Sequence, residues 1–66
     1  MNKNRYKVYQ DPIEKNDFEG NCIILEILRQ DIGTYDGNKF ILADVRFDDG
    51  FETVRTIDLK DKIKSW

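Results

Sequence analysis

The sequence predicts a small all-β protein, and three segments carry that prediction. Residues 39–59 contain two stretches of alternating apolar and polar residues on either side of an Asp-Gly pair. Residues 22–28 form an apolar run rich in β-branched side chains. Residues 5–10 place Tyr6 and Val8 on one face and Arg5, Lys7 and Tyr9 on the other. Short segments of this kind are typical of antiparallel strands.

The segment 39–59 is predicted to be a β-hairpin whose turn is Asp49-Gly50. Few residue pairs tolerate the two positive φ angles of a two-residue type I′ turn, and Asp-Gly is one of them. This turn pairs Val45 with Val54 and Asp44 with Arg55. The predicted inner face consists of Ile41, Ala43, Val45, Phe47 and Val54. A shift by one residue would turn charged side chains inward, so we expect this register.

The first half of the chain is predicted to hold two more strands. Residues 5–10 are expected to lie at a sheet edge and to end at Asp11-Pro12, because proline cannot continue a ladder. The polar residues 13–21 are expected to be a connection. Residues 22–28 are apolar on both faces and are expected to be a strand buried in the middle of the sheet. A helix that is capped by Asn21 and ends at Gly33 is the alternative for this segment.

The remaining segments supply turns and a last strand. A long loop at 31–38 contains the turn residues Asp36 and Gly37, which return the chain into the strand that starts at Lys39. Residues 58–61 can form one short helical turn, and residues 62–66 a short closing strand. Strands in meander order with these turns predict a five-stranded SH3-like small barrel, since closure removes exposed edges.

Several motifs resemble those of a known family. The segments concerned are residues 20–28, Val45-Arg46-Phe47-Asp48-Asp49-Gly50, Val54-Arg55, Asp58-Leu59-Lys60 and Lys62-Ile63-Lys64. They resemble short SH3-like domains of phage and bacterial proteins, which occur alone or beside HNH-type homing nucleases. The V-x-F-x-D-G hairpin is also similar to that of Tudor and KOW domains. The resemblance implies a phage or mobile-element accessory protein whose partner is nucleic acid or a nucleic-acid-handling protein.

Length and composition limit the range of functions. The 66 residues leave room for one domain, residues 1–66, which would bury roughly 60% of its unfolded surface. Charged residues make up 36% of the chain and hydrophobic ones 39%, a globular balance. No apolar run is long enough for a membrane helix, and the first residues do not show the pattern of a signal peptide. We therefore expect a cytoplasmic protein with no membrane partner, and the single Cys22 agrees with a reducing compartment.

The residue types needed for most catalytic sites are missing. The chain has no histidine, one cysteine and one serine, so no Ser-His-Asp or Cys-His arrangement can be assembled. The acidic turn residues lack the spacing of a calcium loop, and zinc has no ligand set. We therefore predict a non-enzymatic interaction module with no metal site and no cofactor.

Charge is segregated along the chain and gives two opposite binding hypotheses. Both ends are basic, and the segment between them is strongly acidic within a net charge of −2. The first hypothesis is nucleic-acid binding, with phosphate contacts and aromatic stacking by Tyr6, Tyr9 or Trp66. Its predicted residues are Lys3, Arg5, Lys7, Lys60, Lys62, Lys64 and Trp66. The second is docking on a basic partner protein, such as a host nuclease, which the module would bind or inhibit. Its predicted residues are Asp44, Asp48, Asp49, Glu52 and Phe51, with Asp58 also on this acidic body.

Two further possibilities concern apolar surfaces. Exposed aromatic side chains could form a peptide-binding groove like those of Tudor and SH3 modules, with Tyr9, Tyr35, Phe40 or Phe51 as walls. The apolar residues on both faces of the segment 22–28 could also support a homodimer, in which Ile24 and Leu28 pack against a second copy.

Overall fold

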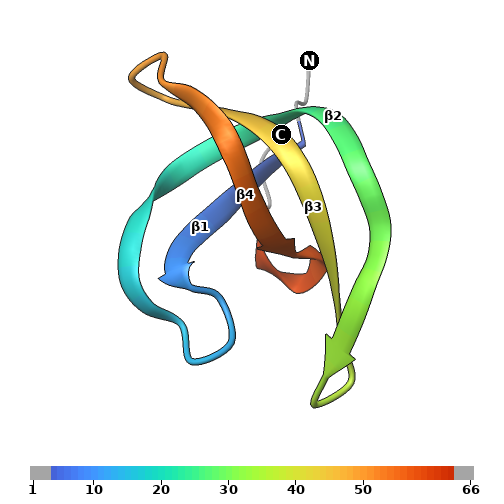
Figure 1. Cartoon of the computed structure of the whole chain (residues 1–66). Coiled ribbons are helices and arrows are strands. Elements are labelled where there is room, and N and C mark those ends of the chain that lie inside the picture. The colour runs from blue at the N-terminus through green and yellow to red at the C-terminus, as the bar shows by residue number, and fades with distance from the viewer. Residues whose placement is uncertain (1–3, 64–66) are drawn as a thin grey trace.

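The chain folds into one sheet of five antiparallel strands in the order β4-β3-β2-β1-β5 (Figure 1). This computed structural model describes residues 4–63. The strands are β1 (Arg5–Asp11), β2 (Asn16–Tyr35), β3 (Asn38–Phe47), β4 (Glu52–Asp58) and β5 (Lys62–Ile63), with a short 3-10 helix η1 (Leu59–Asp61) before β5. The all-β prediction and the helical turn near residues 58–61 are confirmed. The strand at residues 22–28 is also confirmed over the helical alternative.

The sheet is strongly curled because β2 arches over the whole molecule (Figure 1). The first half of β2 pairs with β1 and the second half pairs with β3. Within residues 4–63, β4 pairs only with β3, and β5 pairs only with β1, through Arg5 and Tyr6. The hydrogen-bonded sheet is therefore not closed, so the pairing confirms a curled five-stranded sheet but not the predicted barrel.

The core lies on the concave face of this sheet. It consists of Tyr6, Val8, Cys22, Ile41, Ala43, Val45, Phe47 and Ile57, with Ile24 packed against it. The alternation of buried side chains along β1 and β3 matches the predicted inner faces. Tyr6 is buried in the core, which corrects its predicted role as a stacking residue. No helix in the described part of the chain is long and apolar enough to cross a membrane.

The hairpin of β3 and β4 has a different turn from the predicted one. Phe47 and Phe51 close a three-residue loop, in which the Phe47 N–H donates to the Phe51 carbonyl at 2.8 Å and the Gly50 N–H donates to the Phe47 carbonyl at 2.9 Å. Among the loop residues only Gly50 has a positive φ, of 95°. Three-residue loops of this kind end with a left-handed residue, usually glycine. The Asp49 carboxylate accepts the Phe51 N–H at 3.0 Å and stabilises the loop.

This loop shifts the predicted register by one residue. Val45 pairs with Thr53, Asp44 with Val54, and Ile41 with Ile57. The predicted pairs Val45–Val54 and Asp44–Arg55 are therefore wrong. The inner face of β3 is unchanged, but Val54 is exposed and Ile57 takes the inner position on β4. The shift moves the side chains of β4, not those of β3, and so leaves Asp44 off the core.

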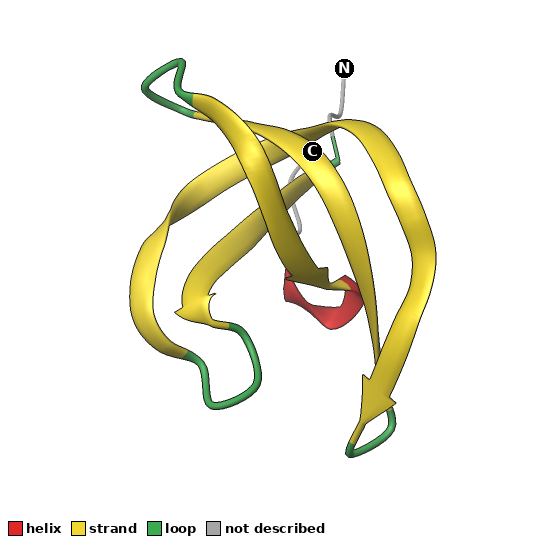
Figure 2. Cartoon of the chain, in the orientation of Figure 1, coloured by secondary structure: helices red, strands yellow, loops and turns green. Residues whose placement is uncertain are grey.

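The connections around β2 are also shorter than predicted. The loop between β1 and β2 spans only residues 12–15, because residues 16–21 already pair with β1. At the other end β2 continues to Tyr35, so the predicted loop at 31–38 reduces to Asp36 and Gly37 (Figure 2). Asp36 and Gly37 have φ angles of 53° and 80°, the two positive values of a type I′ turn. Leu25, Ile27 and Leu28 are exposed, so this segment is not buried on both faces as predicted.

The observed register makes a direct prediction for stability. Ile57 is 1% exposed and Val54 is 44% exposed. We expect Ile57→Ala to lower the free energy of unfolding by about 2–4 kcal/mol, because it leaves a cavity in the core. Val54→Ala should cost about 0.5 kcal/mol or less. Urea denaturation of the two variants measures both values. A larger loss of stability for Val54→Ala than for Ile57→Ala would contradict the observed register and support the one predicted from the sequence.

Candidate functional site

The residues predicted for protein binding divide into two groups. Asp48, Asp49 and Phe51 lie together in the turn between β3 and β4, and all three are exposed. Asp44 lies in the middle of β3, and Glu52 starts β4, where it pairs with Arg46 at 3.9 Å. The structure thus brings together three of the five predicted residues.

The residues predicted for nucleic-acid binding are more dispersed. Lys7 is exposed on β1, Lys60 in η1 and Lys62 on β5. Lys3, Lys64 and Trp66 lie outside the described residues. Arg5 forms an ion pair with Asp48, which joins the two predicted sites directly. The sequence separates these charges by 43 positions, and the antiparallel pairing places them side by side.

A hollow of about 390 Å³ opens beside the β3–β4 turn. It is lined by Phe18, Glu19, Gly20, Asn21, Phe47, Asp48, Asp49 and Phe51. We call it the acidic-aromatic hollow. Its β2 residues were missed by the sequence analysis, because residues 13–21 were expected to be a connection. The one usable signal was Phe18, the single aromatic residue in that largely polar stretch.

The shape of the acidic-aromatic hollow depends on an irregularity in β2. Val8 pairs with Gly20 and Tyr9 pairs with Phe18, so Glu19 has no partner on β1 and forms a bulge. Gly20 has a φ of 152°, and a Cβ atom there would meet the Phe47 ring at 3.2 Å. The absence of a side chain therefore lets the Phe47 ring lie against the β2 backbone.

Three aromatic rings form the walls of the hollow. The Phe47 and Phe51 rings are stacked, with centroids 6.4 Å apart. Phe18 meets Tyr9 edge-on at a centroid distance of 5.5 Å, which fixes its ring at the rim. Phe18 and Phe51 are each 56% exposed. Exposed aromatic faces next to carboxylates make a surface suited to a cation.

Two carboxylates at the rim already hold guanidinium groups. Arg55 donates two hydrogen bonds to Glu19, at 2.8 and 2.7 Å. These bonds lower the pKa of Glu19 and raise the pKa of Arg55. For both groups the effect of the hydrogen bonds exceeds the opposing effect of burial. The second pair is Arg5 with Asp48, which is half-exposed and therefore weak. The hollow thus carries carboxylates that bind arginine side chains in two places.

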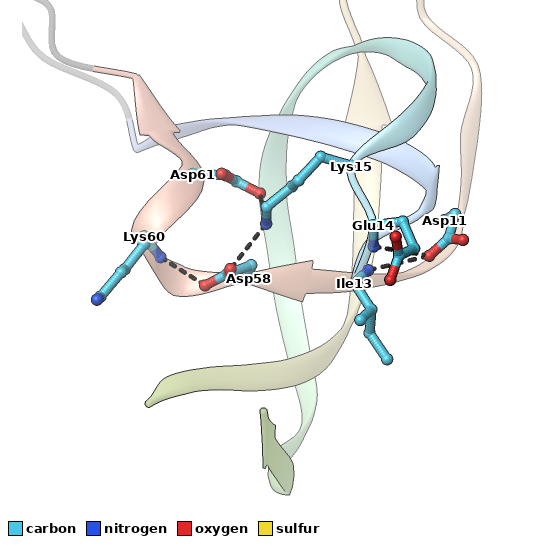
Figure 3. A network of polar contacts seen from close by, with 7 residues as sticks. All are labelled: Asp11, Ile13, Glu14, Lys15, Asp58, Lys60 and Asp61. Atoms are coloured by element: carbon cyan, nitrogen blue, oxygen red, sulfur yellow. Dashed lines mark hydrogen bonds and ion pairs between the residues drawn. The ribbon is translucent and has the colours of Figure 1, made fainter. Parts of the chain in front are cut away.

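A second polar network joins the β1–β2 loop to η1 (Figure 3). The Lys15 ammonium donates to Asp58 at 2.7 Å and to Asp61 at 2.6 Å. The side chain of Asp58 is completely buried, and its other oxygen accepts the Lys60 N–H at 2.9 Å. The Asp11 carboxylate accepts the N–H groups of the loop residues Ile13 and Glu14. The carboxylate of Asp58 is fully used inside the protein, so it is not part of a docking surface.

The surroundings of Lys15 favour its charged form. Burial opposes the ammonium, but the hydrogen bonds to Asp58 and Asp61 outweigh burial and raise the pKa of Lys15. The ammonium also lies 5.7 Å from the centre of the Tyr9 ring and 5.9 Å from that of Phe40. The network is therefore a structural contact that fixes the loop 12–15 against the end of β4.

The four aromatic residues named as possible walls of a peptide groove are divided among three hollows, two of which adjoin. Tyr35 and Phe40 line an apolar hollow of about 390 Å³ between loop 12–15 and the end of the β2–β3 hairpin. Tyr9 lies in a smaller hollow of about 210 Å³. Phe51 belongs to the acidic-aromatic hollow. The hollow of Tyr35 and Phe40 adjoins that of Tyr9, since Pro12 and Thr56 line both, whereas Phe51 lies in a different hollow from the other three.

Cys22 is poorly placed for chemistry. The residue is fully buried, and burial raises the pKa of its thiol to about 11. At neutral pH the thiol is therefore protonated and inaccessible, a state in which cysteine is unreactive. In the part of the chain that the structure describes, no three side chains among His, Cys, Asp and Glu are grouped so that they could hold a metal ion.

Comparison of the chain with models of protein families, with curated protein sequences and with solved structures finds no match. The interpretation of the acidic-aromatic hollow therefore depends on its own geometry and charge.

The Lys15 network predicts a large effect of a single substitution. Lys15→Met leaves the buried Asp58 carboxylate without its cation, and we expect the free energy of unfolding to fall by about 2–3 kcal/mol. The loss is smaller than for a fully buried pair, because the side chain of Lys15 is 32% exposed. Lys39→Met, at an exposed position on β3, is the matched control and should cost about 0.5 kcal/mol or less. Equal losses in urea denaturation would contradict the role of Lys15.

The Glu19–Arg55 pair predicts a pH dependence of stability. The folded pKa of Glu19 lies below its ordinary value of 4.5, so the pair stabilises the protein above about pH 4.5. That contribution is lost as the pH falls through the lowered pKa. We expect wild type to exceed Glu19→Gln by about 1 kcal/mol at pH 7, with the difference shrinking below pH 4.5. In the Arg55→Met background, Glu19→Gln should no longer have this effect in denaturation measured across the pH range.

Proposed function

We propose that this protein is a non-enzymatic interaction module that binds a basic segment of a partner protein in the acidic-aromatic hollow. The observation that carries the proposal is the gathering of Asp48, Asp49 and Phe51 with Phe18 and Phe47 around one hollow. Three of these residues were predicted for protein binding from the sequence. The hollow is large enough for the end of a lysine or arginine side chain.

The physical chemistry of the hollow favours a cation over an apolar or anionic group. Aromatic faces attract cations through the ring quadrupole, and the attraction increases when water is excluded. Asp48 and Asp49 add negative charge at the rim, while Asp49 uses one oxygen to accept the Phe51 N–H. The Arg5–Asp48 pair supports the proposal, because it is a contact of the required kind made within the protein.

We place this module in the SH3-like barrel class and in the phage or mobile-element setting that the sequence motifs imply. The curled five-stranded sheet supports the barrel class. A nuclease or another nucleic-acid-handling protein has the basic surface that the hollow requires. A cytoplasmic location fits such a partner and stays a prediction.

Direct nucleic-acid binding by the remaining basic residues stays a prediction. Lys7, Lys60 and Lys62 are exposed and could contact phosphates. Arg5 is already paired with Asp48, which reduces the charge that the first strand offers to a phosphate. We therefore put docking on a basic protein first.

Substitution of Arg5 distinguishes the two functions, because it should raise the affinity of the protein for a basic peptide and lower its affinity for an oligonucleotide. Arg5→Ala releases Asp48, and we expect binding of a labelled Gly-Arg repeat peptide to become about two- to fivefold tighter. If the basic residues bind phosphates, the same variant should bind a labelled single-stranded oligonucleotide more weakly. Fluorescence anisotropy with both probes at two salt concentrations measures the two affinities side by side.

Substitution of Phe51 tests the hollow itself. Phe51→Ala removes one aromatic wall, and we expect the Gly-Arg peptide to bind about tenfold more weakly. Tyr35→Ala is the matched control, since Tyr35 is similarly exposed but lies in the apolar hollow. A peptide that binds wild type and both variants equally well would rule out the acidic-aromatic hollow as the docking site.

A further inference from the structure

One acceptor atom in the wall of the acidic-aromatic hollow has no hydrogen-bond donor. The side-chain oxygen Oδ1 of Asn21 is buried, and no group within residues 4–63 donates to it. Among the buried side-chain oxygens and nitrogens of the described residues, it is the one that lacks a partner. A buried acceptor without a partner lowers stability, because it has given up its bonds to water. In the wall of a hollow, such an atom points to a donor that the ligand supplies.

The three carboxylates of the hollow already accept hydrogen bonds within the protein. Their donors are the side chains of Arg55 and Arg5 and the backbone N–H of Phe51. Two of these three donors are therefore guanidinium groups. Asn21 is the fourth polar side chain in the lining, and its oxygen is left over. The unused acceptor thus lies in a surface that binds guanidinium groups at two other points.

Asn21 lies directly beside Asp48. The Asp48 N–H donates to the backbone carbonyl of Asn21 at 3.1 Å, and the preceding pair in the ladder is Cys22 with Phe47. Residues opposite each other on paired strands project to the same face, with Cβ atoms about 5 Å apart. Because Cys22 and Phe47 project into the core, Asn21 and Asp48 project away from it. The two residues therefore offer an amide oxygen and a carboxylate side by side.

We propose that the acidic-aromatic hollow takes an arginine side chain in preference to lysine and that Asn21 makes this distinction, an assignment that rests on the proposed function. A guanidinium is a flat fork of five N–H donors, so it can donate to Asp48 and to the Asn21 oxygen together. Its face can lie against an exposed ring such as that of Phe51. The ammonium of lysine is a compact and strongly hydrated charge, so it pairs with Asp48 and gains less from the second acceptor.

The Asn21 oxygen can reach such a donor without a change of fold. Asn21 as a whole is only partly buried, although its oxygen is covered. The terminal torsion of asparagine has a broad, roughly two-fold preference, so the amide turns at low cost. In the free protein the Arg5 guanidinium donates to Asp48 and leaves the Asn21 oxygen without a partner. An arginine of the partner that enters the hollow therefore forms a bond that Arg5 does not form.

The charge around Asn21 favours a cationic donor over a neutral one. Asp48 and Asp49 line the same hollow, and hydrogen bonds from charged donors are roughly twice as strong as those between neutral groups. A site built to pair with an N–H group of its ligand rejects an analogue that leaves the acceptor unpaired. The discrimination against lysine is therefore expected to depend on the oxygen of Asn21 more than on the shape of the hollow.

Paired peptides measure this selectivity. Labelled Gly-Arg and Gly-Lys repeat peptides of equal length carry the same charge, and we expect wild type to bind the Gly-Arg peptide about tenfold more tightly in fluorescence anisotropy. Asn21→Leu removes the acceptor and should bring the two affinities to within about twofold of each other. Asn16→Leu makes the same change at an exposed position of β2 outside the hollow and should keep the tenfold preference. The comparison of variants is needed because arginine pairs better than lysine with carboxylates on any acidic surface.

A second measurement uses wild type and does not depend on the folding of a variant. A hydrogen bond to Oδ1 shifts the side-chain amide signals of Asn21 in the NMR spectrum, so the Gly-Arg peptide should shift them at saturation more than the Gly-Lys peptide does. Unshifted Asn21 signals, or an equal preference for arginine in wild type and Asn21→Leu, would overturn the role of Asn21 while leaving the hollow as a cation site. If neither peptide binds, the proposed function fails and the arginine preference fails with it.

Discussion

The contact between Lys15 and the buried Asp58 is the interaction on which the arrangement of the sheet depends most. In the order β4-β3-β2-β1-β5, hydrogen bonds join each strand to its neighbour. Within residues 4–63, no strand pairing joins β4 to β1 or to β5. Lys15 follows β1, and Asp58 ends β4, so their ion pair joins the β1–β2 loop to the end of β4, two parts of the described chain that no strand pairing connects. Removal of Lys15 leaves the fully buried Asp58 carboxylate without its cation, a costly state in a small core. Both the loop 12–15 and η1 are positioned by this contact.

Local sequence signals identified the strands better than their pairing. Alternation along residues 5–10 and 39–47 gave the correct inner faces, because each pattern belongs to a single strand. The register of β3 and β4 was wrong by one residue, because Asp48-Asp49-Gly50 fits either a two-residue or a three-residue loop. Asp49 does not take the positive φ that the two-residue turn requires, and its carboxylate instead accepts the Phe51 N–H within the three-residue loop. The long β2 was also missed, since its outer half lacks alternation.

The acidic-aromatic hollow could be predicted only in part for a similar reason. Asp48, Asp49 and Phe51 are neighbours in sequence, so their proximity needed no knowledge of the fold. Phe18 and Gly20 reach the hollow through the pairing of β1 with β2, which a polar stretch does not reveal. Arg5 and Asp48 were assigned to opposite functions because the charges were sorted by position along the chain. In the folded protein they form one ion pair, so a basic partner that binds Asp48 would compete with Arg5 for its carboxylate.

The arch of β2 has a consequence for the order of folding. The hairpin of β2 and β3 is closed by the two residues Asp36 and Gly37, so it costs little loop entropy and can form early. The Lys15–Asp58 contact joins residues 43 positions apart and requires both sheet ends to be in place. We expect the β2–β3 hairpin to act as the template onto which β1 and β4 assemble from opposite sides. The contact between the loop 12–15 and the end of β4 is then the last part to form and the first to open, so the bonded amide hydrogens of Ile13, Glu14 and Lys60 should exchange faster than those of the β2–β3 ladder.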